Sequence, residues 1–276
     1  MATLTFNLST KNKKIFDGEY FQKEYYQIMP STQRVLTMST IDSYPQINNP
    51  NILIHMNYIT YVFNAKSIEN NSIARRSLQM YNRLADKLGT KNILIHMPKS
   101  KKEFEYLKFG LQVIYDELIS KGKTLQFEIV PWDKELQELF NLRDDPIKAI
   151  KRFLNIIIKN SFDKNFNIVF DTAHLHALGL DGNSMCELID HYLKYVSYIH
   201  LNGNMNSMFT SDKHAIIFSN ANKFVNSIDP IVRYCSEHKL VCVMEITQER
   251  TKYENYKIFA NRYGFRLVND YSDFSY

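Results

Sequence analysis

The most constraining feature of this 276-residue sequence is a repeated pattern of short apolar runs that each end on a histidine or a carboxylate. The hexapeptide Asn-Ile-Leu-Ile-His-Met occurs twice, at residues 51–56 and 92–97. Later apolar runs end in the same way, on Glu128, Asp171, His200 and Glu245. Apolar runs of this length are typical of strands buried on both faces, as in a parallel sheet covered by helices. The pattern therefore predicts six buried strands that each carry a metal-ligand type of side chain to one end.

Two further β-prone runs, at residues 4–7 and 25–29, precede these six and bring the predicted strands to eight. Helical patterns lie between the strands, such as the one over residues 78–88, and Gly89 follows it where a left-handed helix cap is favoured. Successive ligand-type residues are 29 to 45 positions apart, enough for one strand, one helix and a loop. We therefore expect an α/β fold, a TIM (β/α)8 barrel formed by one domain over residues 1–276.

The composition of the chain argues against several classes of protein. Hydrophobic residues make up 45% and charged residues 23% of it, which provides a full core and argues against disorder. No apolar run reaches the roughly 18 residues of a membrane span, and the N-terminus lacks the core of a signal peptide. The three cysteines have no CxxC spacing, which argues against a zinc ribbon or a disulfide framework. We expect a soluble intracellular monomer without membrane contact, in the cytoplasm, with the nucleus or a viral factory also compatible.

The net charge of +5 fits either a polyanionic partner or simple solubility. Three lysines, Lys99, Lys101 and Lys102, cluster directly after His96. Because they follow a strand end, they should lie on the same rim of the barrel as the ligand-type side chains. If the partner is a polyanion, these lysines are predicted to contact it.

The strand-end side chains are expected to converge, since active sites of this barrel lie at the carboxyl ends of its strands. Taken singly, each could be an ordinary loop residue hydrogen-bonded to a neighbouring amide. Six in consecutive units favour a shared site, where the carboxylates would repel one another unless cations were bound. Two further segments add His174, three residues after Asp171, and the pair Asp212 and His214. The complete predicted set is His55, His96, Glu128, Asp171, His174, His200, Asp212, His214 and Glu245.

Nine imidazole and carboxylate side chains exceed the needs of one ion, because zinc takes about four ligands. Two or three ions with bridging carboxylates fit the set better. The remaining histidines, His176, His191 and His238, are interpreted as structural or solvated. The sole tryptophan, Trp132, is expected to pack beneath a loop.

The order of these motifs resembles that of endonuclease IV, a family of metal-dependent apurinic/apyrimidinic (AP) endonucleases, over most of the chain. The family has a histidine after strands three and four, a glutamate after strands five and eight, D-T-x-H after strand six, H-L-N after strand seven, and D-x-H downstream. The corresponding residues are His55, His96, Glu128, Glu245, Asp171-Thr172-Ala173-His174, His200-Leu201-Asn202 and Asp212-Lys213-His214. The resemblance implies a xylose-isomerase-like barrel of the endonuclease IV type.

By this resemblance, three zinc ions are the expected cofactors. His55, His96 and Glu128 would hold the first, and Glu128 would bridge it to a second held by Asp171, His200 and Glu245. His174, Asp212 and His214 would bind the third. A hydroxide bridging the first two ions would attack the phosphate 5′ to an abasic site, with Glu128 and Glu245 as the catalytic carboxylates. The expected partner is double-stranded DNA with abasic sites, and the process is base excision repair.

The resemblance also implies DNA contacts outside the ligand set. Arg34, in the segment Thr32-Gln33-Arg34, and Tyr58, three residues after His55, match residues that the family inserts into the DNA base stack. Ile59 stands where the family has an apolar wedge. Inserted side chains offset part of the stacking that is lost when a nucleotide is extruded. The alternatives are a surface arginine at the first position and helix packing at the other two.

Two other functions fit parts of the pattern. A sugar isomerase or epimerase on a related barrel would need only Glu128, Asp171, His200 and Glu245 around one or two divalent ions. The second alternative is an inactive DNA-binding barrel kept as a scaffold, although a carboxylate cluster without metal would be unfavourable. The chain also departs from the family near its ligands, with Gly203 where an aspartate is common. This departure is expected to alter metal affinity and rate more than the type of reaction.

Overall fold

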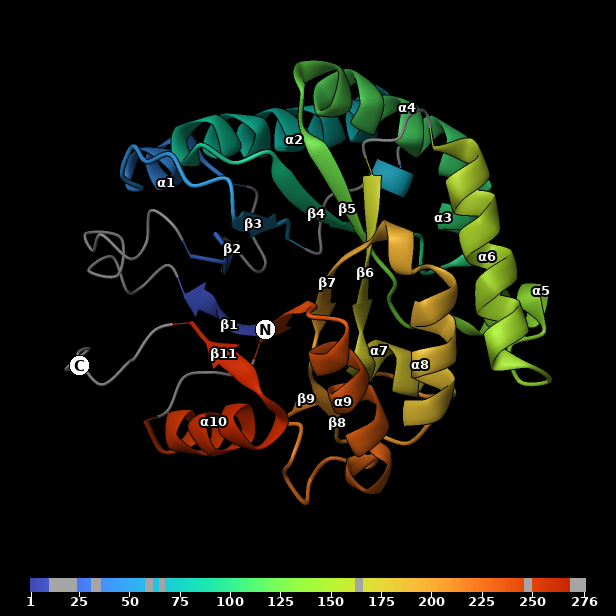
Figure 1. Cartoon of the computed structure of the whole chain (residues 1–276). Helices are drawn as coiled ribbons and strands as arrows, with labels where there is room; N and C mark the ends of the chain where they lie inside the picture. The colour runs from blue at the N-terminus through green and yellow to red at the C-terminus, as the bar shows by residue number, and fades with distance from the viewer. Residues whose placement is uncertain are drawn as a thin grey trace.

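A computed structural model gives the fold and describes residues 1–9, 24–30, 36–57, 62–64, 68–161, 166–245 and 250–268. Eight parallel strands of these residues surround a common axis (Figure 1). They are β1 (Ala2–Ser9), β2 (Tyr26–Met29), β3 (Ile52–His55), β4 (Asn92–His96), β5 (Thr124–Glu128), β6 (Phe166–Asp171), β7 (Val196–His200) and β10 (Val241–Met244). Each strand pairs with the next one along the chain, and β10 pairs back with β1. The predicted TIM-type barrel is therefore confirmed.

Three short strands were not predicted from the sequence. β8 (Gly203–Asn204) and β9 (His214–Ala215) form an antiparallel hairpin after β7. β11 (Phe265–Leu267) pairs with the first half of β1, whereas β2 pairs with the end of β1. The hairpin lies at the mouth of the barrel and matters for the site described below.

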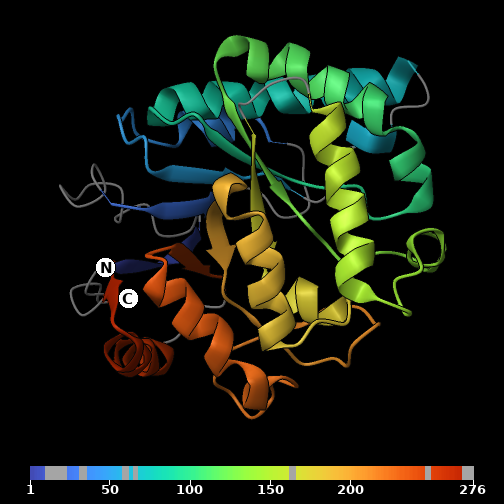
Figure 2. The same ribbon diagram turned by 45° about the vertical axis from the view of Figure 1, so that its right-hand side comes forward.

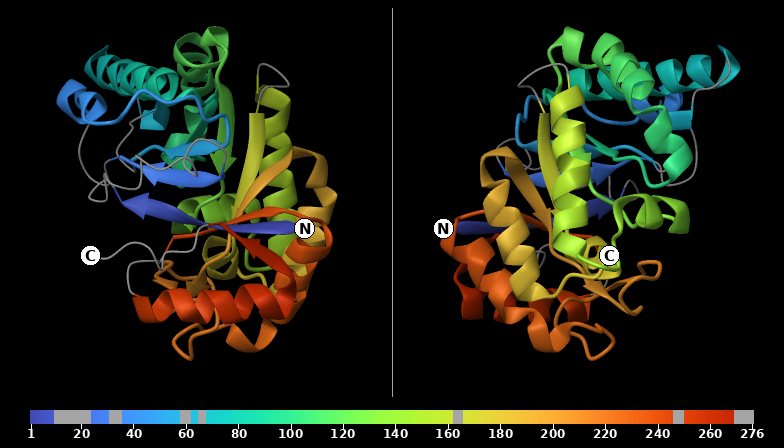
Figure 3. Two further views of the ribbon diagram at one scale, coloured as in Figure 1. Left: turned by 60° about the vertical axis from the view of Figure 1, so that its left-hand side comes forward. Right: turned by 90° about the vertical axis from the view of Figure 1, so that its right-hand side faces the viewer.

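Helices lie on the outside of the strands, as the turned views in Figures 2 and 3 show. They are α1 (Met38–Asp42), α2 (Ile68–Leu88), α3 (Lys101–Glu105), α4 (Leu107–Glu117), α5 (Lys134–Phe140), α6 (Pro146–Asn160), α7 (Thr172–Ala177), α8 (Gly182–His191), α9 (Asp229–Glu237) and α10 (Arg250–Tyr263). Aspartate N-caps start α5, α6 and α8, and each accepts a hydrogen bond from a backbone N–H of the first turn. Within the described ranges, no helix has the length and apolar character needed to cross a bilayer.

The strands are mostly apolar because each packs on both of its faces. One face contributes to the large core between the strands and the helices, for example through Ile54 and Ile95. The opposite face fills the inside of the barrel with Leu53, Leu94, Val169, Tyr198 and Val243. Since side chains two positions apart share a face of a strand, the residue two positions after each of these also faces the barrel interior. Those residues are His55, His96, Asp171, His200 and Glu245.

The predicted left-handed cap at Gly89 is confirmed by its φ of 70°. A Cβ at this position would lie 2.4 Å from the Cα of Asn48, so the backbone would have to move. Gly122 offers a matched control, because its φ is 79° but nothing lies within 4 Å of the added Cβ. We expect Gly122→Ala to cost about 1 kcal/mol of unfolding free energy and Gly89→Ala about 3 kcal/mol. Equal losses for the two variants in urea unfolding would contradict this account.

Candidate metal centre

Six of the nine ligand-type side chains reach the mouth of the barrel directly from strand ends. His55, His96, Glu128, Asp171 and His200 are the last residues of β3, β4, β5, β6 and β7, and Glu245 follows β10. All six are on parallel strands, so their ends lie at the same rim. Glu128, Asp171 and His200 are fully buried, and His55 is almost so.

Asp171 positions His174 through a helix cap. Its Oδ1 accepts hydrogen bonds from the backbone N–H groups of Ala173 (2.6 Å) and His174 (3.0 Å), which starts α7 immediately after β6. His174 thus lies in the first turn of α7, with Nδ1 2.9 Å from the carbonyl oxygen of Ile129. Its Nε2 faces Asp212. The D-T-x-H spacing is therefore the local consequence of a strand that passes directly into a capped helix.

The hairpin of β8 and β9 returns Asp212 and His214 to the mouth. Asn204 holds the turn, because its Oδ1 accepts hydrogen bonds from the backbone of Asn206 and Lys213, each at 3.0 Å. Gly203 is required at the start of the hairpin, since a Cβ there would lie 2.7 Å from the side chain of Asn222. The glycine that departs from the family pattern is thus explained by packing.

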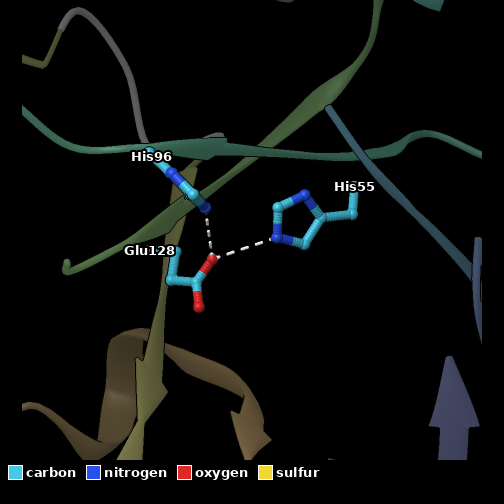
Figure 4. Close-up of side chains that lie close together, drawn as sticks. All are labelled: His55, His96 and Glu128. Atoms are coloured by element: carbon cyan, nitrogen blue, oxygen red, sulfur yellow. Dashed lines mark ion pairs between the residues drawn. The ribbon is translucent and has the colours of Figure 1, made fainter. Parts of the chain in front are cut away.

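The first of three groups consists of His55, His96 and Glu128 (Figure 4). The Nε2 atoms of His55 and His96 lie 3.2 and 3.1 Å from the same carboxylate oxygen, Oε2 of Glu128. This oxygen is buried, and it accepts no hydrogen bond of acceptable geometry from the described residues. Two ring nitrogens and one carboxylate oxygen therefore converge on one place.

The second group is formed by Glu128, Asp171 and His200, with Glu245 beside them. Nδ1 of His200 lies 2.8 Å from Oε1 of Glu128, 3.7 Å from Oδ2 of Asp171 and 3.6 Å from Oε1 of Glu245. Glu128 thus contributes one oxygen to each of the first two groups. This arrangement is the one that a carboxylate bridging two ions requires.

The third group brings together His174, Asp212 and His214. Oδ2 of Asp212 lies 3.4 Å from Nε2 of His174 and 3.3 Å from Nε2 of His214, and the two nitrogens are 3.4 Å apart. Asp171 adjoins the group, with Oδ2 3.7 Å from Nε2 of His214. All nine predicted side chains therefore meet at one mouth.

The spacing of these donors suits metal ions. Nitrogen and oxygen ligands lie about 2.0 to 2.2 Å from zinc, so two ligands of one tetrahedral ion are about 3.3 to 3.6 Å apart. Within the three groups most imidazole and carboxylate atoms are 3.1 to 3.7 Å apart. Together with the unsatisfied oxygen of Glu128, this spacing shows that the described residues could hold metal ions.

Without ions, the carboxylates and several histidines of the cluster balance part of one another's charge, although burial lowers the pKa of His96. Burial lowers the pKa of His200, but the Glu128 and Glu245 carboxylates outweigh it and raise that pKa to about 9. Burial also lowers the pKa of His174, but the carboxylates of Asp171, Asp212 and Glu128 outweigh it and raise that pKa to about 9. Burial raises the pKa of Glu128 and Glu245, but the neighbouring histidines outweigh it and hold both below the ordinary range. Positive imidazoles thus occupy the electrostatic role that cations would take over.

Two amide side chains that sequence reasoning left out of the site support it. Asn202 donates through Nδ2 to Oδ2 of Asp171 (2.6 Å) and to Oε2 of Glu245 (3.2 Å). Gln27, on β2, contacts His200 and Glu245. The signal for Asn202 was its place in the His-Leu-Asn motif. The signal for Gln27 was weaker, a polar residue in the middle of an otherwise β-prone run.

The predicted DNA-contacting residues are placed only in part. Arg34, Tyr58 and Ile59 lie outside the described residues. Lys99 lines a cavity of about 660 Å³, together with His96, His174, Asp212 and His214. Lys101 and Lys102 follow Lys99 closely in the sequence and are exposed in the first turn of α3.

Trp132 also lines this cavity. Its indole is nevertheless buried, and its ring centroid lies 4.8 Å from that of Phe153 and 5.4 Å from that of Phe140. Trp132 therefore has a packing role, as expected, and its ring contacts lie on the helices α5 and α6.

Comparison with known proteins establishes the fold of the chain. No family model and no curated protein matches the sequence. Among solved structures, a D-tagatose 3-epimerase-like protein is 15% identical with a TM-score of 0.62, covering 94% of this chain and 96% of its own. AsfvAP, solved as AsfvAP:AG, is 12% identical with a TM-score of 0.60 and coverages of 94% and 96%. Endonuclease IV from Thermus thermophilus is 16% identical with a TM-score of 0.58 and coverages of 94% and 98%.

These similarities show a xylose-isomerase-like TIM barrel, a fold shared by an endonuclease and by sugar epimerases. Because identities of this size show the fold alone, the choice among activities rests on the side chains at the mouth.

Proposed function

We propose that this protein is a zinc-dependent AP endonuclease of the endonuclease IV type. It hydrolyses the DNA phosphodiester bond 5′ to an abasic site during base excision repair and leaves a 3′ hydroxyl. The observation that carries the proposal is the meeting of nine imidazole and carboxylate side chains in three adjoining groups. A phosphodiester carries negative charge on its phosphoryl oxygens and develops more on the leaving oxygen, which a multi-ion centre is suited to neutralise.

The proposed assignment of ions follows the three groups. His55, His96 and Glu128 would hold one zinc ion, and Asp171, His200 and Glu245, with the second oxygen of Glu128, would hold another. His174, Asp212 and His214 would hold the third. When bound, the ions lower the pKa of a water molecule to supply the nucleophile and stabilise the entering and leaving oxygens.

The residues of the chain position these groups and admit the substrate. Glu128 sets the separation of the first two groups because its two oxygens belong to different groups. Asn202 holds Asp171 and Glu245 in fixed orientations. The cavity beside His96 opens next to Lys99, whose ammonium group is suited to a DNA phosphate.

A direct assay tests the proposal. A duplex with one tetrahydrofuran abasic analogue and a 5′ label is incubated with zinc-loaded protein, with and without a strong chelator. We expect one cut on the 5′ side of the analogue and a 3′ end that a polymerase extends. An undamaged duplex should remain whole, and chelation should stop the reaction until zinc is restored. If the zinc-loaded protein leaves the abasic duplex intact, the proposal is wrong.

A sugar isomerase or epimerase is the second candidate. It is supported by the similarity to a D-tagatose 3-epimerase-like protein and by the subset Glu128, Asp171, His200 and Glu245. That subset uses the second group alone and leaves His55, His96, His174, Asp212 and His214 without a task. Elemental analysis separates the two candidates: about three zinc ions per chain favour the nuclease, and one manganese or magnesium ion favours the sugar enzyme.

The three lysines beside the mouth are expected to contribute to DNA affinity. Each lysine that neutralises a phosphate lowers the slope of log affinity against log salt by about 0.9, so replacing Lys99, Lys101 and Lys102 with glutamine should flatten it by up to about 3. Lys91, Lys159 and Lys239 are exposed near the opposite ends of the strands and form a matched control triple. Fluorescence anisotropy with an abasic duplex at several salt concentrations measures both slopes. Equal slopes for both triple variants and the unmodified protein would show that the mouth lysines do not contact DNA.

A further inference from the structure

We propose that Gln27 is a positioning residue of the metal centre, which selects the ring nitrogen that His200 presents and holds Glu245 beside it. This inference rests on the proposed metal-dependent function and adds to it a residue from a strand that supplies no ligand. Gln27 lies on β2, is completely buried, and has both ends of its amide engaged. Its Oε1 lies 2.7 Å from Nε2 of His200, and its Nε2 lies 2.8 Å from Oε1 of Glu245.

The orientation of the Gln27 amide is determined by Glu245. An ionised carboxylate can only accept hydrogen bonds, so the amide must turn its N–H group toward Glu245. The reverse orientation would bring two oxygens within 2.8 Å of each other. The amide oxygen therefore faces His200, and Nε2 of His200 must donate to it.

This hydrogen bond fixes the state of the His200 ring. With the proton held on Nε2, the other nitrogen keeps a lone pair once the ring is neutral. That nitrogen, Nδ1, is the one that faces Glu128, Asp171 and Glu245 in the second group. Gln27 therefore directs the lone pair of His200 toward the place where a cation would lie.

His200 differs in this respect from two other histidines of the cluster. Nδ1 of His55 lies 2.7 Å from the carbonyl oxygen of Met56, and Nδ1 of His174 lies 2.9 Å from that of Ile129. Both rings are thus oriented by the backbone and present Nε2. His200 presents Nδ1 and is oriented by a side chain, so its orientation depends on the identity of residue 27.

A single substitution with a matched control tests the inference. Gln27→Met keeps the length of the side chain and removes its donor and acceptor. Gln126→Met is the control, because Gln126 is also buried inside the barrel but bonds Asn92 and Ser197 rather than the cluster. We expect Gln27→Met to weaken the affinity for one of the bound zinc ions about 10- to 100-fold in a chelator competition. The control should keep the affinity of the unmodified protein.

A measurement on the unmodified protein keeps the test independent of how the variant folds. Nitrogen-15 histidine labelling of the zinc-loaded protein should show His200 protonated at Nε2 and bound through Nδ1, and His55 and His174 bound through Nε2. Binding of His200 through Nε2, or equal zinc affinity for Gln27→Met and the unmodified protein, would overturn the inference. Failure to bind any divalent ion would overturn it together with the proposed function. Zinc binding of the expected kind without cleavage of abasic DNA would refute the nuclease and leave the role of Gln27 standing.

Discussion

Replacing Glu128 with glutamine will reduce incision of a duplex with one abasic analogue by at least about 10³-fold. The reason is that the two oxygens of Glu128 lie in different groups, Oε2 with His55 and His96 and Oε1 with His200. A neutral amide keeps the volume of the side chain but offers one oxygen instead of two. The first two groups would then no longer share a carboxylate, which would weaken the binding of the ions that supply the nucleophile.

Glu117 provides a control for the loss of a buried carboxylate as such. It is also buried, but it lies on α4 and is paired with Arg75 at 2.9 Å and with Lys121 at 2.8 Å, away from the mouth. Glu117→Gln should lower the unfolding free energy and leave incision by the folded protein unchanged. Circular dichroism and single-turnover cleavage separate the two effects. If Glu128→Gln retains cleavage within a few-fold of the unmodified protein, the bridging role is wrong.

The barrel could be predicted because its strands carry a signal that survives without any alignment. A strand covered by helices outside and by packed side chains inside is apolar at most positions, and residues 52–54 and 93–95 are apolar at every one. The polar residue that ends each run is equally informative, because it marks the point where the strand leaves the apolar core. The convergence of nine side chains at one mouth follows from barrel closure, which local periodicity alone does not reveal.

Other features were beyond sequence reasoning for physical reasons. The hairpin of β8 and β9 has two residues in each strand, too few to show a period, and its stability comes from Asn204 and Asn222. The apolar pattern over residues 104–118 is continuous, yet the structure divides it into α3 and α4 at Tyr106. Gln27 was missed because one polar residue in a strand gains meaning only when the closed barrel brings it against His200.

Removal of the metal is expected to reverse the way in which stability depends on pH. In the metal-free fold the pKa values of His174 and His200 lie at about 9, above the ordinary value of 6.5. A raised pKa means that the protonated ring stabilises the fold fully below about pH 6.5, and that this contribution is lost as the pH rises through about 9. Each ring contributes on the order of 3 kcal/mol by this linkage.

The carboxylates of the cluster act in the opposite direction. The pKa values of Glu128, Asp212 and Glu245 are held below their ordinary range, because the neighbouring histidines outweigh the effect of burial. Their contribution is present above pH 4 to 5 and is lost as the pH falls further. Since the two sets of groups define opposite limits, the metal-free protein should be most stable between about pH 4.5 and 6.5.

Zinc should shift this optimum upward, because imidazoles must lose a proton before they bind a metal ion. Between pH 6 and 9, the midpoint of thermal unfolding should fall by on the order of 10 °C for the chelator-treated protein and stay level or rise for the zinc-loaded protein. His200→Gln should flatten the decline of the metal-free form, whereas His191→Gln, at an exposed position on α8, should leave it unchanged. A metal-free protein that becomes more stable from pH 6 to 9 would show that the histidines are neutral in the fold. Neutral histidines could not offset the repulsion among the buried carboxylates, so the electrostatic balance described for the metal-free cluster would be wrong.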